Sequence, residues 1–296
     1  MQSSSDGIRL PPPWITPAAG KVDREVQPVI TVSRRRPPAS GGLWTFNQAT
    51  TSLWLNARDP NTLFDAVTGG NPVSSGNTFA RWQDKKNNGI SATQSTEARR
   101  LTYNATGFNG LACVTAVEAT TGKVMALPTL PLLTAAGAGV VCYTFSLASD
   151  IAYGVVASLQ HWDRFTDGRS YPELLRAARI DTLALSPPTT GQHIMVYIAN
   201  PLGPEYTIRR DGAQIYRSTT PFTFSNNVTG IGAGSNIAGG GAGGTALNGS
   251  IAEIAILPGA WQMADIFRFE GYMTHAALMS NVLPANHLYK TAAPTI

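Results

Sequence analysis

The chain has 296 residues, of which 43% are hydrophobic and only 14% are charged, and it contains 29 glycines and 20 prolines. This balance is typical of a turn-rich all-β protein rather than a helical one, and the length is sufficient for a sizeable core. The net charge is only +4, and no apolar run reaches the roughly 18–20 residues of a membrane-spanning helix, so we expect no membrane as a partner.

Residues 1–45 differ in composition from the rest of the chain. They carry most of the net charge of +4, and prolines, which favour extended backbone, interrupt them repeatedly. Such a segment cannot bury a core of its own, although "REVQPVITVSR" predicts one short edge strand. We expect a basic arm that docks on a partner protein through Trp14, Arg34, Arg35 and Arg36. An arginine triplet without interleaved aromatic residues is weak support for nucleic acid, so we expect none.

From Leu43 onward the sequence alternates between apolar and polar residues with period two. "HIMVYIA", for example, places Ile194, Val196 and Ile198 on one face of a strand, and Asp211-Gly212 is a dipeptide favoured by two-residue hairpin turns. Many short strands at even spacing are typical of two sheets packed face to face. We therefore predict one domain over residues 46–296, an all-β, two-sheet antiparallel jelly-roll sandwich.

One helix is predicted near the end of the chain, at about residues 260–279. Its apolar stripe recurs at helical spacing, through Met263, Ile266, Phe269 or Glu270, Met273 and Ala277. This stripe should pack against the sandwich. The glycine-rich stretch 230–249 has no lysine and precedes a strand rather than a helix, so we predict a surface loop instead of a phosphate-binding loop.

The two cysteines each lie in an apolar run typical of a strand. Cys113 is found in "LACVTAV" and Cys142 in "VVCYTFSL". Since a free cysteine behaves as a small buried hydrophobe, we predict two reduced core thiols. A disulfide would be possible only if the two strands were neighbours.

Patterns for catalysis or metal binding do not stand out. No two histidines are two to four residues apart, and Asp163 and Asp167 lack the acidic repetition of a calcium loop. A glycosidase needs two carboxylates that face each other across a cleft, whereas Glu253 is a lone acid in its strand. We predict that Glu253 is a structural residue, either at a sheet edge or held by hydrogen bonds. The expectation is a protein that is not an enzyme, with no cofactor and no metal.

The stretch "QHWDRFTDGRSYPELLRAAR" concentrates aromatic and charged residues in a chain otherwise poor in charge. Sugars are bound by aromatic faces together with groups that bond hydroxyls. The candidate glycan-binding residues are Trp162, Asp163, Asp167, Arg169 and Tyr171. The alternative is a hairpin whose Trp162 and Phe165 anchor it in the core while its charges are solvated.

Two stretches near the start of the domain, "LWLNARDPNTLF" and "ARWQDKKNNGISATQ", resemble the opening of the laminin-G-like, concanavalin A-like lectin/glucanase modules of tailed-phage virion proteins. The resemblance continues through "WDRFTDGRSY", "LNGSIAEIAIL" and "FEGYMTHAAL", and covers about residues 43–294. It implies a concanavalin A-like sandwich in which Trp54 and Trp82 are core or sheet-packing anchors. It also implies a turn at "DKKNNG" in which Asn88 and Gly89 have positive φ.

The same resemblance implies a non-enzymatic structural or adhesion component of a phage virion, on a tail or head appendage. Residues 1–45 would anchor it to other virion proteins, the protein would be a homo-oligomer in the particle, and a host-surface glycan is its candidate ligand. One alternative is a purely structural head decoration or cement protein. Another is a glycoside hydrolase or lyase, which the missing carboxylate pair disfavours. The N-terminal residues have no signal-peptide pattern, so we expect synthesis in the host cytoplasm and location in the virion.

Overall fold

The computed structural model describes residues 42–116, 123–128, 130, 138–148, 157–158, 161–166, 169–174, 191–200, 205–218, 229–232 and 247–296. The chain divides into two units, Met1–Ala39 and Ser40–Ile296. The first unit lies outside the described residues, and so do Trp14, Arg34, Arg35 and Arg36. Docking through residues 1–45 therefore stays a prediction.

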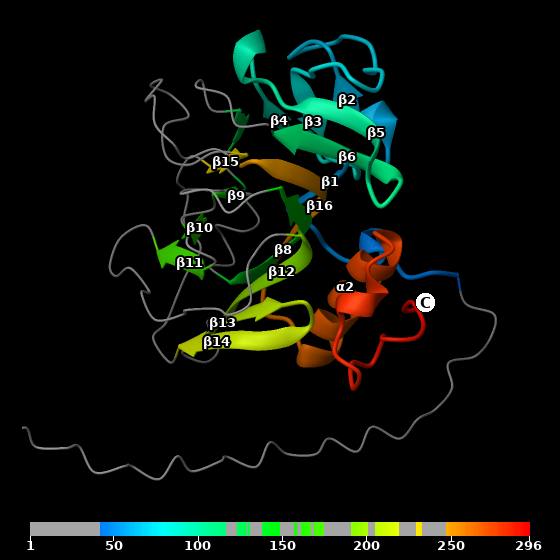
Figure 1. Ribbon diagram of the computed structural model, residues 1–296, viewed down its shortest axis with the longest axis vertical. Helices are drawn as coiled ribbons and strands as arrows, with labels where there is room; N and C mark the ends of the chain where they lie inside the picture. Colours follow the sequence, from blue (N-terminus) through cyan, green and yellow to red (C-terminus); the bar gives the residue numbers. More distant parts are fainter. Residues whose placement is uncertain are drawn as a thin grey trace, which may run out of the picture. The chain divides into compact units, whose positions relative to one another are not determined.

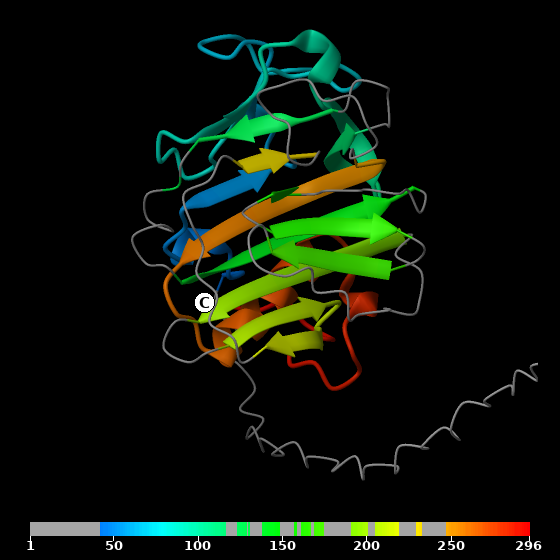
Figure 2. The same cartoon turned by 90° about the vertical axis from the view of Figure 1, so that its left-hand side faces the viewer.

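Two antiparallel sheets form the framework of the second unit (Figures 1 and 2). The strands of the larger sheet are β1 (Leu53–Asn56), β5 (Thr102–Phe108), β6 (Leu111–Ala116), β8 (Gly139–Leu147), β12 (Gly191–Asn200), β13 (Glu205–Arg210), β14 (Ala213–Ser218) and β16 (Gly249–Pro258). Their order is β14-β13-β12-β8-β16-β6-β5, and β1 also pairs with β16. This arrangement confirms the predicted all-β, antiparallel two-sheet sandwich.

The smaller sheet consists of β2 (Leu63–Phe64), β3 (Arg81–Gln83), β4 (Ser91–Thr93), β7 (Met125–Leu127), β9 (Ala157–Ser158) and β15 (Thr229–Ile231). Its order is β2-β3-β4-β7-β15-β9. A separate hairpin is formed by β10 (His161–Thr166) and β11 (Arg169–Leu174). The helical elements are α2 (Met263–Ala276) and four short 3-10 turns, η1 (Phe46–Gln48), η2 (Pro60–Thr62), η3 (Glu97–Arg99) and η4 (Ser280–Val282).

The larger sheet is the middle of three layers. On its inner face, which looks toward the smaller sheet, Leu53 and Ile254 belong to the core between the sheets. On its other face, here called the helix face, Trp54 and Ala255 pack with Phe269 of α2. Figure 1 shows α2 on one side of β8 and β12, with β9 and β15 on the other. Because both faces are covered, β16 is buried along nearly its whole length instead of alternating with exposed residues.

The helix is shorter than its predicted range of about 260–279. Its buried side includes Ile266, Phe269 and Met273, as the apolar spacing predicted. Met263, however, is 42% exposed, so the stripe begins one turn later than predicted. No helix among the described residues is long and apolar enough to cross a membrane.

The motif around Trp82 is a turn that fastens β1 to the rest of the sandwich. The Asp84 carboxylate accepts hydrogen bonds from the backbone N–H groups of Trp54, at 2.6 Å, and Asn88, at 3.0 Å. Burial raises the pKa of the Asp84 carboxyl. The positive φ values belong to Asn87 (56°) and Gly89 (75°), which corrects the predicted pair Asn88 and Gly89. Asn88 instead donates a hydrogen bond from its backbone N–H to Asp84, and the first positive φ of the turn is therefore at Asn87, one residue earlier than predicted.

The remaining local predictions can be compared directly with the structure. Trp54 and Trp82 are buried core residues, as predicted. Cys113 and Cys142 are buried and free, which confirms the two core thiols, and burial raises the pKa of both. The Asp211-Gly212 pair forms the predicted hairpin, with φ values of 52° and 79° between β13 and β14. Residues 233–246 of the glycine-rich stretch lie outside the described residues.

Candidate functional site

The predicted glycan-binding stretch does form a hairpin. The register of β10 and β11 pairs Trp162 with Glu173, Arg164 with Tyr171, and Thr166 with Arg169. Asp167 lies outside the described residues. The structure describes the backbone but not the side chains of the other four candidates, Trp162, Asp163, Arg169 and Tyr171. Their glycan-binding role therefore stays a prediction.

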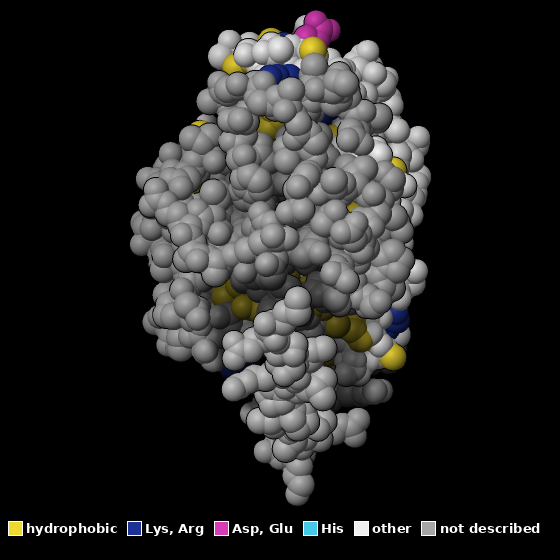
Figure 3. All heavy atoms as spheres, turned by 60° about the vertical axis from the view of Figure 1, so that its left-hand side comes forward, with side chains coloured by type: hydrophobic (Ala, Val, Ile, Leu, Met, Phe, Trp, Pro, Cys, Tyr) yellow, Lys and Arg dark blue, Asp and Glu magenta, His cyan; other side chains and the backbone are white. Residues whose placement is uncertain are grey.

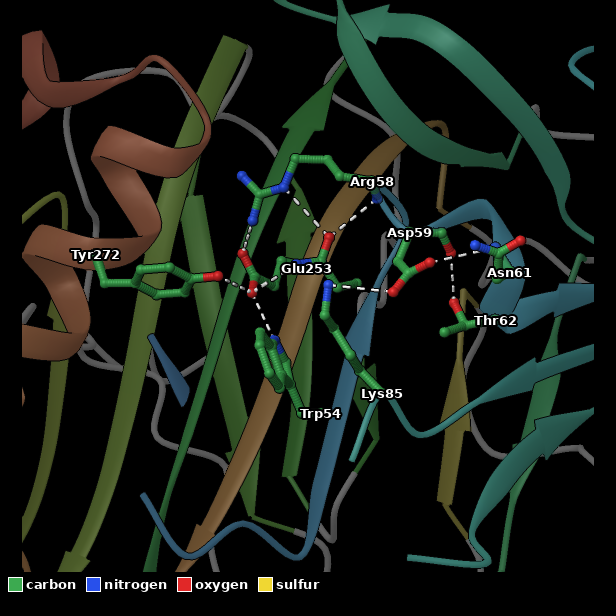
Figure 4. Close-up of polar contacts among 9 residues, drawn as sticks. Trp54, Arg58, Asp59, Asn61, Thr62, Lys85, Glu253 and Tyr272 are labelled. Atoms are coloured by element: carbon green, nitrogen blue, oxygen red, sulfur yellow. Dashed lines mark hydrogen bonds and ion pairs between the residues drawn. The ribbon is translucent and has the colours of Figure 1, made fainter. Parts of the chain in front are cut away.

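The densest polar cluster in the described structure surrounds Glu253 on the helix face of β16 (Figure 4). Its Oε1 accepts hydrogen bonds from Trp54 Nε1 at 2.6 Å, Tyr272 OH at 3.0 Å and Asn56 Nδ2 at 3.2 Å. Its Oε2 forms an ion pair with Arg58 Nη2. Figure 4 shows Trp54, Arg58 and Tyr272 converging on the carboxylate from β1, the segment after it and α2.

This cluster holds the layers together. The Glu253 side chain is 0% exposed, so its charge is removed from water and must be balanced by these donors. Burial, followed by the neighbouring Glu253 charge, raises the pKa of Tyr272 well above its ordinary value, which keeps the phenol protonated as a donor. Of the two predicted settings for Glu253, the hydrogen-bonded one is confirmed. The sheet-edge one is wrong, because Glu253 of β16 pairs with β1 on one side and with β8 on the other.

The Asp59-Pro60 pair of "LWLNARDPNTLF" lies beside this cluster and begins a short turn. Asp59 caps η2, since its Oδ1 accepts a hydrogen bond from Asn61 N at 3.3 Å, and Pro60 is the first residue of that turn. Lys85 Nζ lies 3.2 Å from Asp59 Oδ2. The motif therefore stabilises the segment that follows β1.

A second buried carboxylate, Glu270 of α2, joins three parts of the chain. Arg209 Nε of β13 lies 2.7 Å from Glu270 Oε1, and His287 Nε2 of the C-terminal segment lies 3.0 Å from Oε2. Because Tyr289 N–H donates to His287 Nδ1 at 3.2 Å, Nε2 carries the proton and donates to Glu270. Sequence reasoning placed Glu270 in the helical stripe but could not supply its partners, which are distant in the chain.

A row of tyrosines crosses the inner face of the larger sheet, and we call it the tyrosine row. It consists of Tyr143, Tyr197, Tyr206 and Tyr216, one each from β8, β12, β13 and β14. Neighbouring ring centroids are 5.9, 6.5 and 6.4 Å apart. Tyr143 and Tyr206 are buried, whereas Tyr216 is partly exposed, so the row runs from the core toward the surface. Figure 3 shows a few described hydrophobic side chains in the lower half of this side of the molecule.

Two polar side chains share the inner face with the tyrosine row. His193 precedes Met195 and Tyr197 on alternate positions of β12, and Arg210 follows Tyr206 and Ile208 on alternate positions of β13, so both side chains project from the face of the row. The register pairs Met195 with Arg210, which makes His193 and Arg210 diagonal neighbours.

Each of these two residues has a buried atom without a hydrogen-bond partner in the described structure, His193 Nε2 and Arg210 Nη1. His193 Nδ1 lies 2.7 Å from Asp211 Oδ2, and Asp211 Oδ1 accepts a bond from Ile194 N–H at 3.0 Å. Buried polar atoms in native proteins are normally paired, so these two atoms, like the other buried unpaired atoms of the described structure, require a water molecule or a ligand as partner. Sequence reasoning missed both residues because it used Asp211 only as a turn residue and gave His193 no partner.

The described ranges contain no group of three or more His, Cys, Asp or Glu side chains that could hold a metal ion. Near the tyrosine row, the described contact between such side chains is the pair His193 and Asp211.

Comparison with known proteins identifies no family for this chain. No family model matches the chain, and no curated protein matches it. Among solved structures it is similar to Domain 4 of AbnA, a GH43 extracellular arabinanase from Geobacillus stearothermophilus in complex with arabinotriose, with 13% identity over 74% of this chain and 97% of that chain and a TM-score of 0.48. It is also similar to a Trypanosoma rangeli sialidase, with 11% identity over 75% of this chain and 32% of that chain and a TM-score of 0.44.

A third likeness is to the CBM40 of a Ruminococcus gnavus IT-sialidase bound to α2,3-sialyllactose. The identity is 13%, the match covers 43% of this chain and 79% of that chain, and the TM-score is 0.35. At such identities, and with TM-scores below 0.5, these likenesses say nothing about what this chain binds.

Proposed function

We propose that this protein is a non-enzymatic glycan-binding component of a tailed-phage virion. Its sandwich presents the binding face, and residues 1–45 anchor it to other virion proteins, with several copies in one particle. Carried on a tail or head appendage after synthesis in the host cytoplasm, it contacts glycans of the host surface.

The observation that carries the glycan-binding proposal is the composition of the inner face beside Tyr216. A partly exposed aromatic ring is found there together with the unpaired buried atoms of His193 and Arg210. Sugars present C–H patches to an aromatic face and hydroxyls to polar atoms, so one patch that offers both suits them. The hairpin of β10 and β11, with Trp162 and Tyr171, is proposed as a further part of the binding surface.

The virion location is supported by the sequence resemblance over residues 43–294 and by the basic, proline-rich arm. A single stacking contact with a few hydrogen bonds gives affinities of roughly millimolar order, near −4 kcal/mol. Many copies on one particle would raise the avidity to a useful level. A virion therefore suits a weak site of this kind.

Two alternative functions are distinguished by their chemistry. A decoration protein would use the same sandwich to bind only virion proteins. A glycoside hydrolase would need two carboxylates facing a substrate. The two carboxylates buried deepest in the described structure, Glu253 and Glu270, are instead paired with Arg58 and Arg209. This pairing favours the binding function over hydrolysis.

A glycan array read with multivalent protein tests the proposal. The wild type should bind a subset of bacterial surface glycans, and Tyr216→Ala should lose most of that binding. Tyr216→Phe is the matched control, because it keeps the ring and should keep most of the binding. If no glycan binds although the protein joins phage particles, the decoration function is correct. Release of sugars from host polysaccharide would establish the hydrolase.

A further inference from the structure

We propose that Arg210 and His193 form a subsite for an acidic sugar, with the sugar carboxylate on Arg210 and a sugar hydroxyl on His193. The proposal rests on the glycan-binding function above and assigns the class of glycan. It concerns the same inner face, at the end of the tyrosine row near the hairpin of β13 and β14.

Arg210 has a buried Nη1 and, like Arg81, Arg99 and Arg100, no carboxylate partner in the described part of the chain. Arg58, Arg209 and Arg268 each form an ion pair with an acidic side chain. Its positive charge acts on its surroundings, since it offsets part of the burial that raises the pKa of Tyr197 well above the ordinary value.

A guanidinium with a buried donor and no counter-charge is best satisfied by an anion. The planar fork of arginine matches a carboxylate, which can accept two parallel hydrogen bonds from it. A neutral sugar would satisfy the donor but would leave the charge unbalanced in a partly buried site. The chemistry of Arg210 therefore favours a carboxylated sugar.

His193 supplies the complementary group. Asp211 accepts a backbone N–H through one oxygen and lies 2.7 Å from His193 Nδ1 through the other, so in the neutral form of the ring the proton is on Nδ1. Nε2, which is buried and unpaired, then has a free lone pair. A lone pair accepts a bond from a hydroxyl but repels a carboxylate. The two diagonal neighbours therefore select an acid group and a hydroxyl of one sugar residue.

The geometry of the sheet supports a single binding subsite. Diagonal neighbours on adjacent strands are about 7–8 Å apart, which long side chains can span together with one bound monosaccharide. The partly exposed ring of Tyr216 is on the next strand of the same sheet, β14. It can contact the C–H face of the same sugar or of its neighbour.

The test measures binding of full-length protein to oligogalacturonate and 3′-sialyllactose, each in its natural form and after reduction of the carboxyl group to an alcohol. Wild type should bind at least one acidic form about tenfold or more tightly than its reduced form. Arg210→Gln should remove that preference. Arg268→Gln is the matched control, since it removes one positive charge from α2 on the helix face and should keep the preference.

His193→Leu separates the two roles. It should weaken acidic and reduced forms alike, by about fivefold, because both keep the hydroxyls. Melting curves of every variant should match those of wild type to within a few degrees, so that lost binding is not lost folding.

Several outcomes would overturn the acidic-sugar assignment. Equal binding of acidic and reduced forms, or a preference that survives in Arg210→Gln, would leave the glycan-binding function standing without it. Arg210-dependent binding of a sulfated oligosaccharide with no binding of either carboxylated one would assign the subsite to sulfate instead. Absence of binding to all these glycans and to a broad neutral array would refute the glycan-binding function as well.

Discussion

Replacing Glu253 with glutamine tests the structural role of the cluster that joins β1, β16 and α2. Glutamine keeps the shape, so no cavity forms. With its oxygen in place of Oε1, it can still accept from Trp54, Asn56 and Tyr272. Its NH₂ group then faces the guanidinium of Arg58, so a donor meets a donor where an ion pair existed.

The magnitude follows from the burial of the two partners. Breaking a buried ion pair costs about 3–5 kcal/mol, and the Arg58 side chain is 17% exposed, so partial hydration of its charge places the loss near the lower end, about 3 kcal/mol. For a domain of this size, that loss corresponds to a decrease of about 6–12 °C in melting temperature. Arg58→Met should cost more, about 4 kcal/mol, because it leaves the fully buried Glu253 charge without a cation.

Urea unfolding of wild type, Glu253→Gln, Arg58→Met and the double variant measures these terms. The double variant should be more stable than the sum of the single losses implies, by about 2 kcal/mol, because each single change strands the other partner. Glycan binding per folded molecule should not change. A loss below about 1 kcal/mol for Glu253→Gln, or normal stability with lost binding, would show that the carboxylate has a functional rather than a structural role.

Three further predictions concern other parts of the chain. Because burial raises the pKa of both thiols, Cys113 and Cys142 should stay almost unlabelled by iodoacetamide at about pH 8.5 in native protein and react fully after denaturation; rapid native labelling would contradict their burial. Deleting residues 1–41 should leave the melting temperature unchanged and abolish incorporation into phage particles, so normal incorporation would disprove the anchoring role. Gly249→Ala should destabilise the protein by about 3 kcal/mol or more in urea unfolding, because an added Cβ would lie 1.9 Å from the backbone oxygen of Ser146; a loss within about 0.5 kcal/mol would refute this steric argument.

The features that could be predicted from sequence are those set by local patterns. The Asp211-Gly212 hairpin followed from the dipeptide, and the burial of Trp82 and Cys142 followed from their apolar surroundings. Local patterns do not predict which of two adjacent residues has positive φ when a hydrogen bond from another residue decides it. Asn87 rather than Asn88 has positive φ, because Asp84 captures the N–H of Asn88.

The pairing of distant groups could not be predicted. Glu253 was correctly expected to be structural, but its ion pair with Arg58 spans 195 positions and depends on β1 pairing with β16. The subsite is equally non-local. No single stretch contains His193 and Arg210 together, and only the register of β12 with β13 makes them neighbours. The sequence search therefore concentrated on the contiguous cluster around Trp162 and overlooked this pair.

The most direct test of the glycan-binding account is an experimental structure of the full-length protein with the oligosaccharide that it binds most tightly. The account predicts a sugar ring against Tyr216 on the inner face of the larger sheet, with a carboxylate at Arg210 and a hydroxyl at His193 Nε2. A sugar bound elsewhere on the molecule, with Arg210 and His193 paired only to protein groups, would contradict it.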